Sequence, residues 1–325
     1  MPDGRLVDIV VSGGRIVSLD PRADDLAERV DLEGALVVPG FVEGHIHLDK
    51  CWIGDSWKPH IPYTAGFDVR ERLRFESELL RTAAPMDHRA SELIELAVSH
   101  GTCHIRSHVD VDAAVGLRHL ETLLAARERY RDAVSIEFVA FPQHGVISCP
   151  GTAELLDAAV LAGADRIGGI DPGGMDRDIE GQLSVTFGIA ERRGVDVDIH
   201  LHDAGLLGVF QLEQIAARAA ALGMAGHVAV SHAYSLGDVA PDIVRRTADT
   251  LAKAGVSIMT NAPGSRAFPP IKDLVAAGVL VFSGNDNVRD SWWPYGEADM
   301  LQRAMLLGYC SGFYTDEDLS LAFDL

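Results

Sequence analysis

The chain alternates between short apolar runs and longer segments in which apolar residues recur every three or four positions. The first pattern is typical of buried β-strands and the second of amphipathic α-helices. Pro and Gly mark many of the boundaries between them. The apolar runs predict eight strands, at residues 40–47, 102–109, 135–141, 166–170, 196–202, 228–232, 256–259 and 279–283. Helical patterns lie between most of these strands, at residues 92–99, 117–130, 152–162, 182–193, 209–222 and 242–254.

Strand–helix alternation predicts parallel strands that are joined by helical crossovers. Eight such units predict a closed (β/α)₈ barrel, a TIM-like fold of the α/β class. A doubly wound open sheet is the alternative, but no Gly-x-Gly-x-x-Gly motif follows an early strand.

The first 38 residues have a different pattern. Apolar runs at residues 6–11 and 15–19 flank Ser12-Gly13-Gly14, which predicts a β-hairpin. We interpret residues 1–38 as part of a small β-sandwich and residues 39–325 as the barrel. The sequence after the barrel supplies no strands to complete the sandwich, so we expect the sandwich to be incomplete. An open strand edge would be a site for pairing in a homo-oligomer.

Charge and composition exclude several classes of partner. The chain of 325 residues has 28 Lys and Arg against 48 Asp and Glu, a net charge of −20. Because nucleic acids and anionic membrane surfaces carry the same sign, we expect neither as a partner. No apolar run reaches the roughly 18 residues of a membrane-spanning helix, and the N-terminus lacks the pattern of a signal peptide. We therefore expect a cytoplasmic protein with four reduced, scattered cysteines.

Polar residues gather where the predicted strands end. The first strand ends in His45-Ile46-His47, and residues i and i+2 of a strand point to the same face. The fifth strand ends in His200-Leu201-His202-Asp203, the sixth ends in Ser231-His232, and Asp286 follows the eighth. In such barrels the catalytic residues follow the carboxyl ends of the strands. Because unpaired polar groups are costly to bury, this gathering predicts a metal site.

We assign His45, His47, His200 and Asp286 as ligands of one divalent ion. Three imidazoles and one carboxylate suit Zn²⁺ or Fe²⁺. His202 has the same strand parity as His200 and is an alternative ligand. In binuclear barrels a carbamylated lysine at the end of the fourth strand often bridges two metals. None of the four lysines lies there, which favours a single ion.

Several of these segments resemble the amidohydrolase superfamily, and within it the cytosine deaminase branch. The resemblance rests on VPGFVEGHIHLD at residues 38–49, RSHVDV at 106–111, VAFPQ at 139–143, DIH at 198–200, SH at 231–232, and Asp286 followed by Trp292 and Pro294. It implies a metal-dependent hydrolase with the four ligands named above.

The resemblance also implies roles for individual side chains. His232 would orient the attacking hydroxide and stabilise the developing oxyanion, and Asp286 would accept the proton of the water. Gln143 would recognise the amide edge of a pyrimidine ring. Phe141 and Trp292 would form walls of the substrate pocket.

Two positions depart from the cytosine deaminase pattern. Asp203 stands where those enzymes have a glutamate that carries a proton to the ring nitrogen, and it remains our candidate general acid and base. Asn287 stands in place of a carboxylate near the exocyclic group of the substrate, and an amide both donates and accepts hydrogen bonds. Both changes alter substrate contacts and leave the metal ligands unchanged.

Two further features have structural interpretations, and a third has a functional one. We interpret His108 as a buried, hydrogen-bonded histidine that supports the site. Lys50 and Trp52 follow the His-x-His segment and are candidates for a substrate loop. The arginine- and glutamate-rich segment at residues 70–81 is interpreted as a solvated helix face.

The leading hypothesis is a hydrolase that uses a metal-activated water to deaminate a small N-heterocycle, either a cytosine-like pyrimidine or a triazine. The alternative is a hydrolase of the same fold that opens a cyclic amide or removes an alkylamine. A non-catalytic binding relative is the third hypothesis.

Overall fold

The computed structural model describes residues 6–19, 28–66, 68–264 and 266–325. It divides into two units, Met1–Gly40 and Phe41–Leu325. In the first unit, β1 (Val10–Ser12) pairs antiparallel with β2 (Arg15–Ser18). The connecting Gly13 and Gly14 have φ angles of 57° and 74°, the left-handed conformation that a two-residue hairpin turn requires. Residues 1–5 and 20–27 of the predicted sandwich portion lie outside the described residues.

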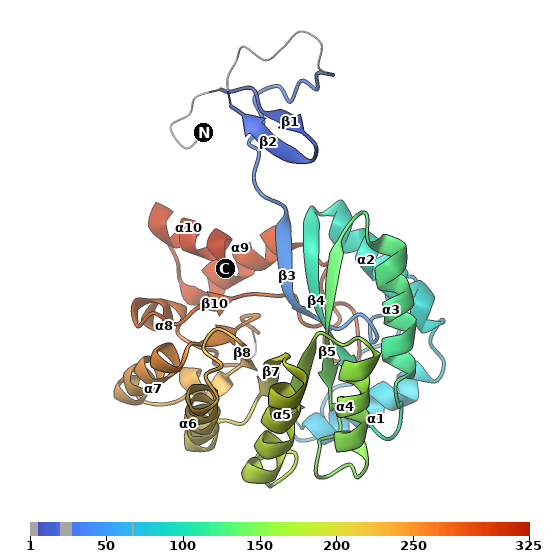
Figure 1. Cartoon of the computed structure of the whole chain (residues 1–325), viewed down its shortest axis with the longest axis vertical. Helices are drawn as coiled ribbons and strands as arrows, with labels where there is room; N and C mark the ends of the chain where they lie inside the picture. The colour runs from blue at the N-terminus through green and yellow to red at the C-terminus, as the bar shows by residue number, and fades with distance from the viewer. Residues whose placement is uncertain (1–5, 20–27, 67, 265) are drawn as a thin grey trace. The chain divides into compact units, whose positions relative to one another are not determined.

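The second unit is a barrel of eight parallel strands in sequence order (Figure 1). Gly44 N donates to Ser283 O at 3.2 Å and Asp286 N donates to His45 O at 2.7 Å, and these contacts join the first barrel strand to the last. The predicted (β/α)₈ barrel is confirmed, and the open-sheet alternative is wrong. The strands are β3 (Phe41–Ile46), β4 (Thr102–Asp110), β5 (Ser135–Phe141), β6 (Arg166–Ile170), β7 (Asp196–Leu201), β8 (Val228–His232), β9 (Val256–Met259) and β10 (Val281–Phe282).

Helices follow the strands and surround the barrel (Figure 1). One buried apolar cluster fills the space between the strands and these helices, with Ile105, Leu123 and Ile199 among its fully buried members. In the described part of the chain, no helix is both long and apolar enough to cross a membrane. The helices are α2 (Met86–Ser99), α3 (Arg118–Tyr130), α4 (Thr152–Ala162), α5 (Ile179–Arg193), α6 (Gly205–Ala221), α7 (Pro241–Ala254), α8 (Ile271–Ala276), α9 (Met300–Ser311) and α10 (Asp316–Asp324), with a 3₁₀ turn at Tyr234–Gly237.

An additional helix, α1 (Val69–Leu80), lies in the long connection between β3 and α2. The sequence predicted residues 70–81 to be a solvated helix face, and this is wrong for the side of α1 that packs against the protein. Arg72 is fully buried and Glu76 is 3% exposed. Arg72 Nη1 donates to the carbonyl oxygens of Ile61 and Ser291, at 2.9 and 2.7 Å, which compensates in part for the loss of water on burial.

Candidate active site

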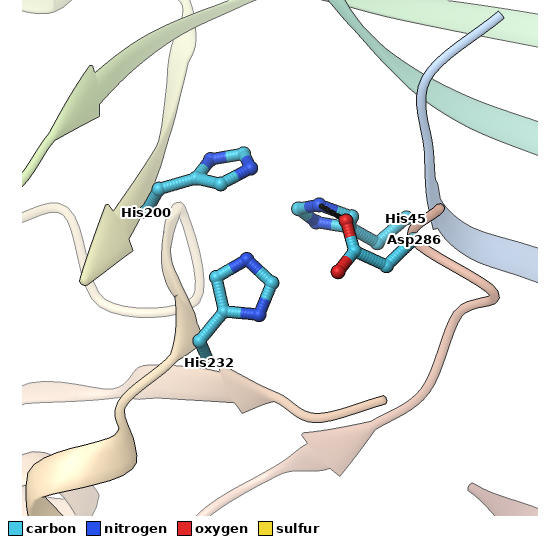
Figure 2. A group of neighbouring side chains, drawn as sticks. All are labelled: His45, His200, His232 and Asp286. Carbon is cyan, nitrogen blue, oxygen red and sulfur yellow. Dashed lines mark ion pairs between the residues drawn. The ribbon is translucent and has the colours of Figure 1, made fainter. Parts of the chain in front are cut away.

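The carboxyl ends of β3, β7 and β8 and the segment after β10 bring four potential metal ligands together (Figure 2). His45, His200, His232 and Asp286 are all buried, and one potential ligand atom from each lies within 4.8 Å of the others. His45 Nε2 is 3.5 Å from Asp286 Oδ1. The group therefore contains three of the four residues that the sequence predicts as ligands.

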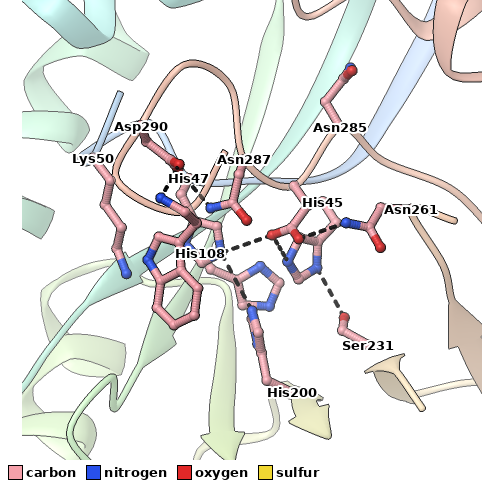
Figure 3. A network of polar contacts seen from close by, with 12 residues as sticks. His45, His47, Lys50, His108, His200, Ser231, Asn261, Asn285, Asn287 and Asp290 are labelled. Carbon is pink, nitrogen blue, oxygen red and sulfur yellow. Dashed lines mark hydrogen bonds and ion pairs between the residues drawn. The ribbon is translucent and has the colours of Figure 1, made fainter. Parts of the chain in front are cut away.

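His47, the fourth predicted ligand, adjoins this group. Its Nε2 lies 3.5 Å from Asp286 Oδ1 and 3.4 Å from His200 Nε2 (Figure 3). The structure thus brings all four predicted ligands to one place and adds His232, for which the sequence predicted a catalytic role.

Several polar atoms of this group have no hydrogen-bond partner among the described residues. They are His45 Nε2, His47 Nδ1, His200 Nδ1 and both ring nitrogens of His232. A buried polar atom without a partner costs free energy, and a divalent cation would compensate for several such atoms at once. Nitrogen and carboxylate donors are the ligands that zinc and similar metals prefer. The residues present therefore fit a metal ion.

The electrostatics of the group also suit a metal. Burial lowers the pKa of His200 and of His232 well below the ordinary value, and burial together with the nearby Lys50 charge lowers the pKa of His47. Burial by itself would raise the pKa of Asp286, but His232 and the contacts from His45 and His47 outweigh it and hold that pKa well below its usual range. Neutral imidazoles and an ionised carboxylate are the forms that bind metals.

The backbone is strained at two members of the group. His232 has a φ of 74° and Asp286 a φ of 60°, which lie in the left-handed region that non-glycine residues seldom adopt. Such conformations persist where surrounding contacts fix them, and they are common at functional sites. For Asp286 these contacts are the backbone bond to His45 and a hydrogen bond of 2.8 Å from Asn261 Nδ2 to its Oδ2.

Of the predicted pocket residues, Phe141 ends β5 and lies against the histidines, and Gln143 follows it by two positions. The Phe141 ring stacks on His200 with centroids 4.1 Å apart. Gln143 is buried, and its Oε1 accepts a hydrogen bond from Lys50 Nζ. Lys50 Nζ also lies 2.8 Å from Asp110 Oδ1. The buried ammonium of Lys50 therefore fixes the orientation of the Gln143 amide, a role that the sequence did not indicate.

The remaining predicted pocket residues, Asn287 and Trp292, belong to one polar network, in which Asn287 contacts Asp290 (Figure 3). Asn287 Nδ2 donates to Asp290 Oδ2 at 2.6 Å, and Asp290 Oδ1 accepts from Trp292 N at 2.8 Å. Trp292 Nε1 donates to Glu76 Oε2 at 2.7 Å, and Glu76 Oε1 is 3.9 Å from Lys50 Nζ. The network connects the loop after β10 to α1. The sequence patterns did not single out Asp290 as part of this network. Its position four residues after Asp286 is the feature of the sequence that could have indicated it.

The predicted proton carrier, Asp203, follows His200 by three positions, and none of its described hydrogen bonds joins it to the four grouped residues. Its Oδ2 accepts from Gly174 N and from Gln211 Nε2, both at 2.8 Å. Burial and the nearby charge of Asp171 raise the pKa of Asp203. A raised pKa suits a carboxyl group that both holds and releases a proton.

Two neighbouring histidines have supporting positions. His202 Nδ1 is 2.8 Å from Asp171 Oδ2, and the His202 ring stacks on His232. His202, the alternative ligand, is not a member of the group formed by His45, His200, His232 and Asp286. His108 is fully buried as predicted, but its Nε2 is 3.5 Å from Asp198 Oδ1, beyond an ordinary hydrogen-bond length. The predicted hydrogen bond of His108 is thus replaced by a longer electrostatic contact.

Comparison with known proteins agrees with this geometry. The profile described as "Amidohydrolase family" matches residues 28–323. The structure of N-isopropylammelide isopropylaminohydrolase from Burkholderia multivorans is 40% identical, covers 98% of this chain and 80% of its own, and superposes with a TM-score of 0.90.

Two further relatives extend the comparison. The structure of 5-methylcytosine deaminase from Klebsiella pneumoniae with phosphonocytosine is 26% identical, with a TM-score of 0.82, and the match covers 98% of this chain and 81% of that one. N-isopropylammelide isopropyl amidohydrolase of Pseudomonas sp. (strain ADP) is 29% identical over 98% of this chain and 80% of its own length. This chain belongs to the amidohydrolase family, whose members are metal-dependent hydrolases.

Proposed function

We propose that this chain hydrolyses a C–N bond of a small oxo-substituted N-heterocycle and releases an alkylamine or ammonia. The observation that carries the proposal is the buried group of His45, His200, His232 and Asp286, in which one potential ligand atom from each residue lies within 4.8 Å of the others and several ring nitrogens have no described hydrogen-bond partner. Membership of the amidohydrolase family supports the same reaction class.

In this proposal one divalent ion, Zn²⁺ or Fe²⁺, is held by His45, His47, His200 and Asp286. Such an ion supplies Lewis-acid activation of water and stabilises negative charge that develops on oxygen. The carboxyl end of β6 carries Asp171 and no lysine, in keeping with a single ion.

The side chains around the ion would divide the proton transfers between them. Asp286, held ionised, accepts the proton of the attacking water. His232 is neutral and has no described hydrogen-bond partner on either ring nitrogen, so it can donate to the oxygen on which charge develops. Asp203, with its raised pKa, delivers a proton to the leaving nitrogen, directly or through a water.

Two side-chain amides are oriented to recognise a lactam-like ring. Gln143 Oε1 is occupied by Lys50, which leaves its amide nitrogen to donate to a carbonyl of the substrate. Asn287 Nδ2 is occupied by Asp290, which leaves its oxygen to accept from a ring N–H. One donor and one acceptor match the oxo-substituted face of a triazine or pyrimidine. Phe141 and Trp292 supply aromatic walls for such a flat ring.

The leaving group is a separate question. The 40% identity to the isopropylaminohydrolase exceeds the 26% identity to the 5-methylcytosine deaminase, which favours release of an alkylamine. Ammonia release, the leading hypothesis from the sequence, is the second candidate, because the deaminase also superposes over 98% of this chain.

A product assay separates these candidates. The purified protein, loaded with Zn²⁺ or with Fe²⁺, is incubated with N-isopropylammelide, its free-amino analogue, cytosine and 5-methylcytosine. Ring products and released amines are quantified by mass spectrometry. We expect the highest kcat/KM for N-isopropylammelide, and none in the Asp286→Ala variant. Equal or greater kcat/KM for cytosine would favour the deaminase, and no turnover of any amino-substituted heterocycle would contradict the proposal.

A further inference from the structure

A fully buried hydroxyl lies behind one of the proposed ligands. Ser231 Oγ is 3.0 Å from His45 Nδ1 (Figure 3) and donates to Asp198 Oδ1 at 2.8 Å. His45, Asp198 and Ser231 are each 0% exposed. The contact at Nδ1 lies on the side of the His45 ring away from Nε2, the atom nearest Asp286.

The hydrogen-bond directions in this chain of contacts are determined by chemistry. Arg106 Nη1 lies 3.1 Å from Asp198 Oδ2, and the permanent charge of a guanidinium favours an ionised carboxylate that can only accept. The single hydroxyl proton of Ser231 therefore points to Asp198. Ser231 Oγ can then only accept from His45, so His45 Nδ1 must carry the ring proton.

A neutral imidazole has one ring proton, so a proton on Nδ1 leaves Nε2 bare. His45 Nε2 has no hydrogen-bond partner in the described part of the chain and lies 3.5 Å from Asp286 Oδ1. We propose that Asp198 and Ser231 are positioning residues that hold His45 in the one tautomer whose Nε2 can bind the metal ion. This inference rests on the metal site proposed above, and it assigns functions to two residues that contact no substrate.

The strand register explains how these two residues reach His45. Asp198 precedes His200 by two positions on β7, so both side chains share one strand face. Ser231 on β8 is paired directly with His200 and precedes His232. The two strands that supply His200 and His232 therefore also supply the residues that orient His45.

The test compares three variants at two serines, the buried Ser231 and the half-buried Ser257. Ser231→Ala removes the acceptor for His45 Nδ1, and Ser231→Thr retains it. Ser257→Ala is the matched control, because its hydroxyl lies on the next strand, β9, and donates to Val228 O at 3.2 Å. Each protein is loaded with Zn²⁺. The rate of zinc release to a chromogenic chelator and the Tm of the metal-free protein are then measured.

We expect Ser231→Ala to release zinc faster than the wild type, by about 10–100-fold, because the loss of an outer partner of a ligating histidine usually lowers metal affinity by that factor. Ser231→Thr and Ser257→Ala should release zinc at close to the wild-type rate. The metal-free Tm separates this effect from a folding defect, because a purely structural role would lower that Tm without changing zinc release from folded protein.

Asp198→Asn is a further variant, and it decides the outcome if Ser231→Ala does not fold. An asparagine can turn its amide nitrogen toward Ser231, which allows the hydroxyl to donate to His45 Nδ1 and selects the other tautomer, so zinc release should again be faster. If folded Ser231→Ala or Asp198→Asn released zinc at the wild-type rate, this inference would be overturned, but the proposed metal site would stand. A wild-type protein that retains neither Zn²⁺ nor Fe²⁺ would overturn the proposed metal site and this inference with it.

Discussion

Individual side chains at the carboxyl ends of the strands are held by contacts that the proposed chemistry does not use. Ser231 fixes His45, Asn261 fixes Asp286, and Lys50 fixes the amide of Gln143. In each case one polar atom is occupied by the protein and another is left facing the site. Preorganisation of this kind avoids the cost of reorienting groups during the reaction.

At the residue scale, we predict the effect of replacing Asp203. Asp203→Asn keeps the shape of the side chain but cannot carry a proton, so kcat should fall by about 100-fold or more, the usual contribution of a general acid or base. Zinc content should be unchanged, because no described contact joins Asp203 to the ligand group. Steady-state kinetics and elemental analysis measure the two effects.

The control for this variant is Asp249→Asn, which alters an exposed carboxylate on α7. It should leave both kcat and zinc content at their wild-type values. An unchanged kcat in Asp203→Asn would mean that another group carries the proton.

At the scale of elements, helix α1, which lies between β3 and α2, contacts the loop that follows the last strand, β10. Arg72 donates to the carbonyl of Ser291, and Glu76 accepts from the Trp292 indole. These contacts anchor the loop that carries Asn287 and Trp292, both proposed to contact the substrate. The helix therefore stabilises one wall of the pocket from behind.

We predict that Glu76→Ala weakens substrate binding and stability together. It leaves the Trp292 indole N–H without its carboxylate, which costs about 1–3 kcal/mol when the group is buried. Thermal unfolding should show a lower Tm, and KM should rise more than kcat falls. Glu78→Ala, on the exposed side of the same helix, is the control and should change neither value. A KM equal to that of the wild type in folded Glu76→Ala would contradict this role of α1.

The element order and the gathering of His45, His47, His200 and Asp286 at one end of the barrel could be predicted from the sequence because they depend on local patterns. Apolar runs gave the eight strands, and the i, i+2 spacing of His45 and His47 placed two imidazoles on one face. The last strand, Val281–Phe282, is shorter than its apolar run because the ladder with β9 pairs only these two residues, and Ser283 N donates instead to Leu325 O at 2.7 Å.

Other features were not predictable because they depend on contacts between distant segments. The pairing of Lys50 with Gln143 joins residues 93 positions apart. The charges of α1 resemble those of a solvated helix, and only the packed structure shows that Arg72 and Glu76 face inward. The direction of the hydrogen bond at His45 needs Asp198, Ser231 and Arg106 together.

At the scale of the whole molecule, several buried carboxyl groups couple stability to pH. Burial and the negative charge of Glu76 raise the pKa of Asp290 to about 7, against the lowering effect of its hydrogen bonds, among them that from Trp293 N. The unfolded value is near 3.8. The folded state therefore binds more protons than the unfolded state between these values, and the stability contributed by protonated Asp290 is lost as the pH rises toward 7 and above.

We therefore predict that Asp290→Asn, which resembles the protonated form, increases the Tm relative to the wild type more at pH 8 than at pH 5. Differential scanning calorimetry across this range measures the difference, and Asp249→Asn provides the control. A difference in Tm that does not change with pH would show that Asp290 does not titrate as described.

Metal content tests the central claim most directly, that side chains from distant strands hold one catalytic ion. Wild-type protein and the Asp286→Ala variant are loaded with Zn²⁺, dialysed, and analysed by inductively coupled plasma mass spectrometry, with Asp249→Ala as the control. We predict about one zinc ion per chain in the wild type and the control, and none in Asp286→Ala. A wild-type protein without bound metal, or an Asp286→Ala variant that retains its full zinc content, would contradict the account.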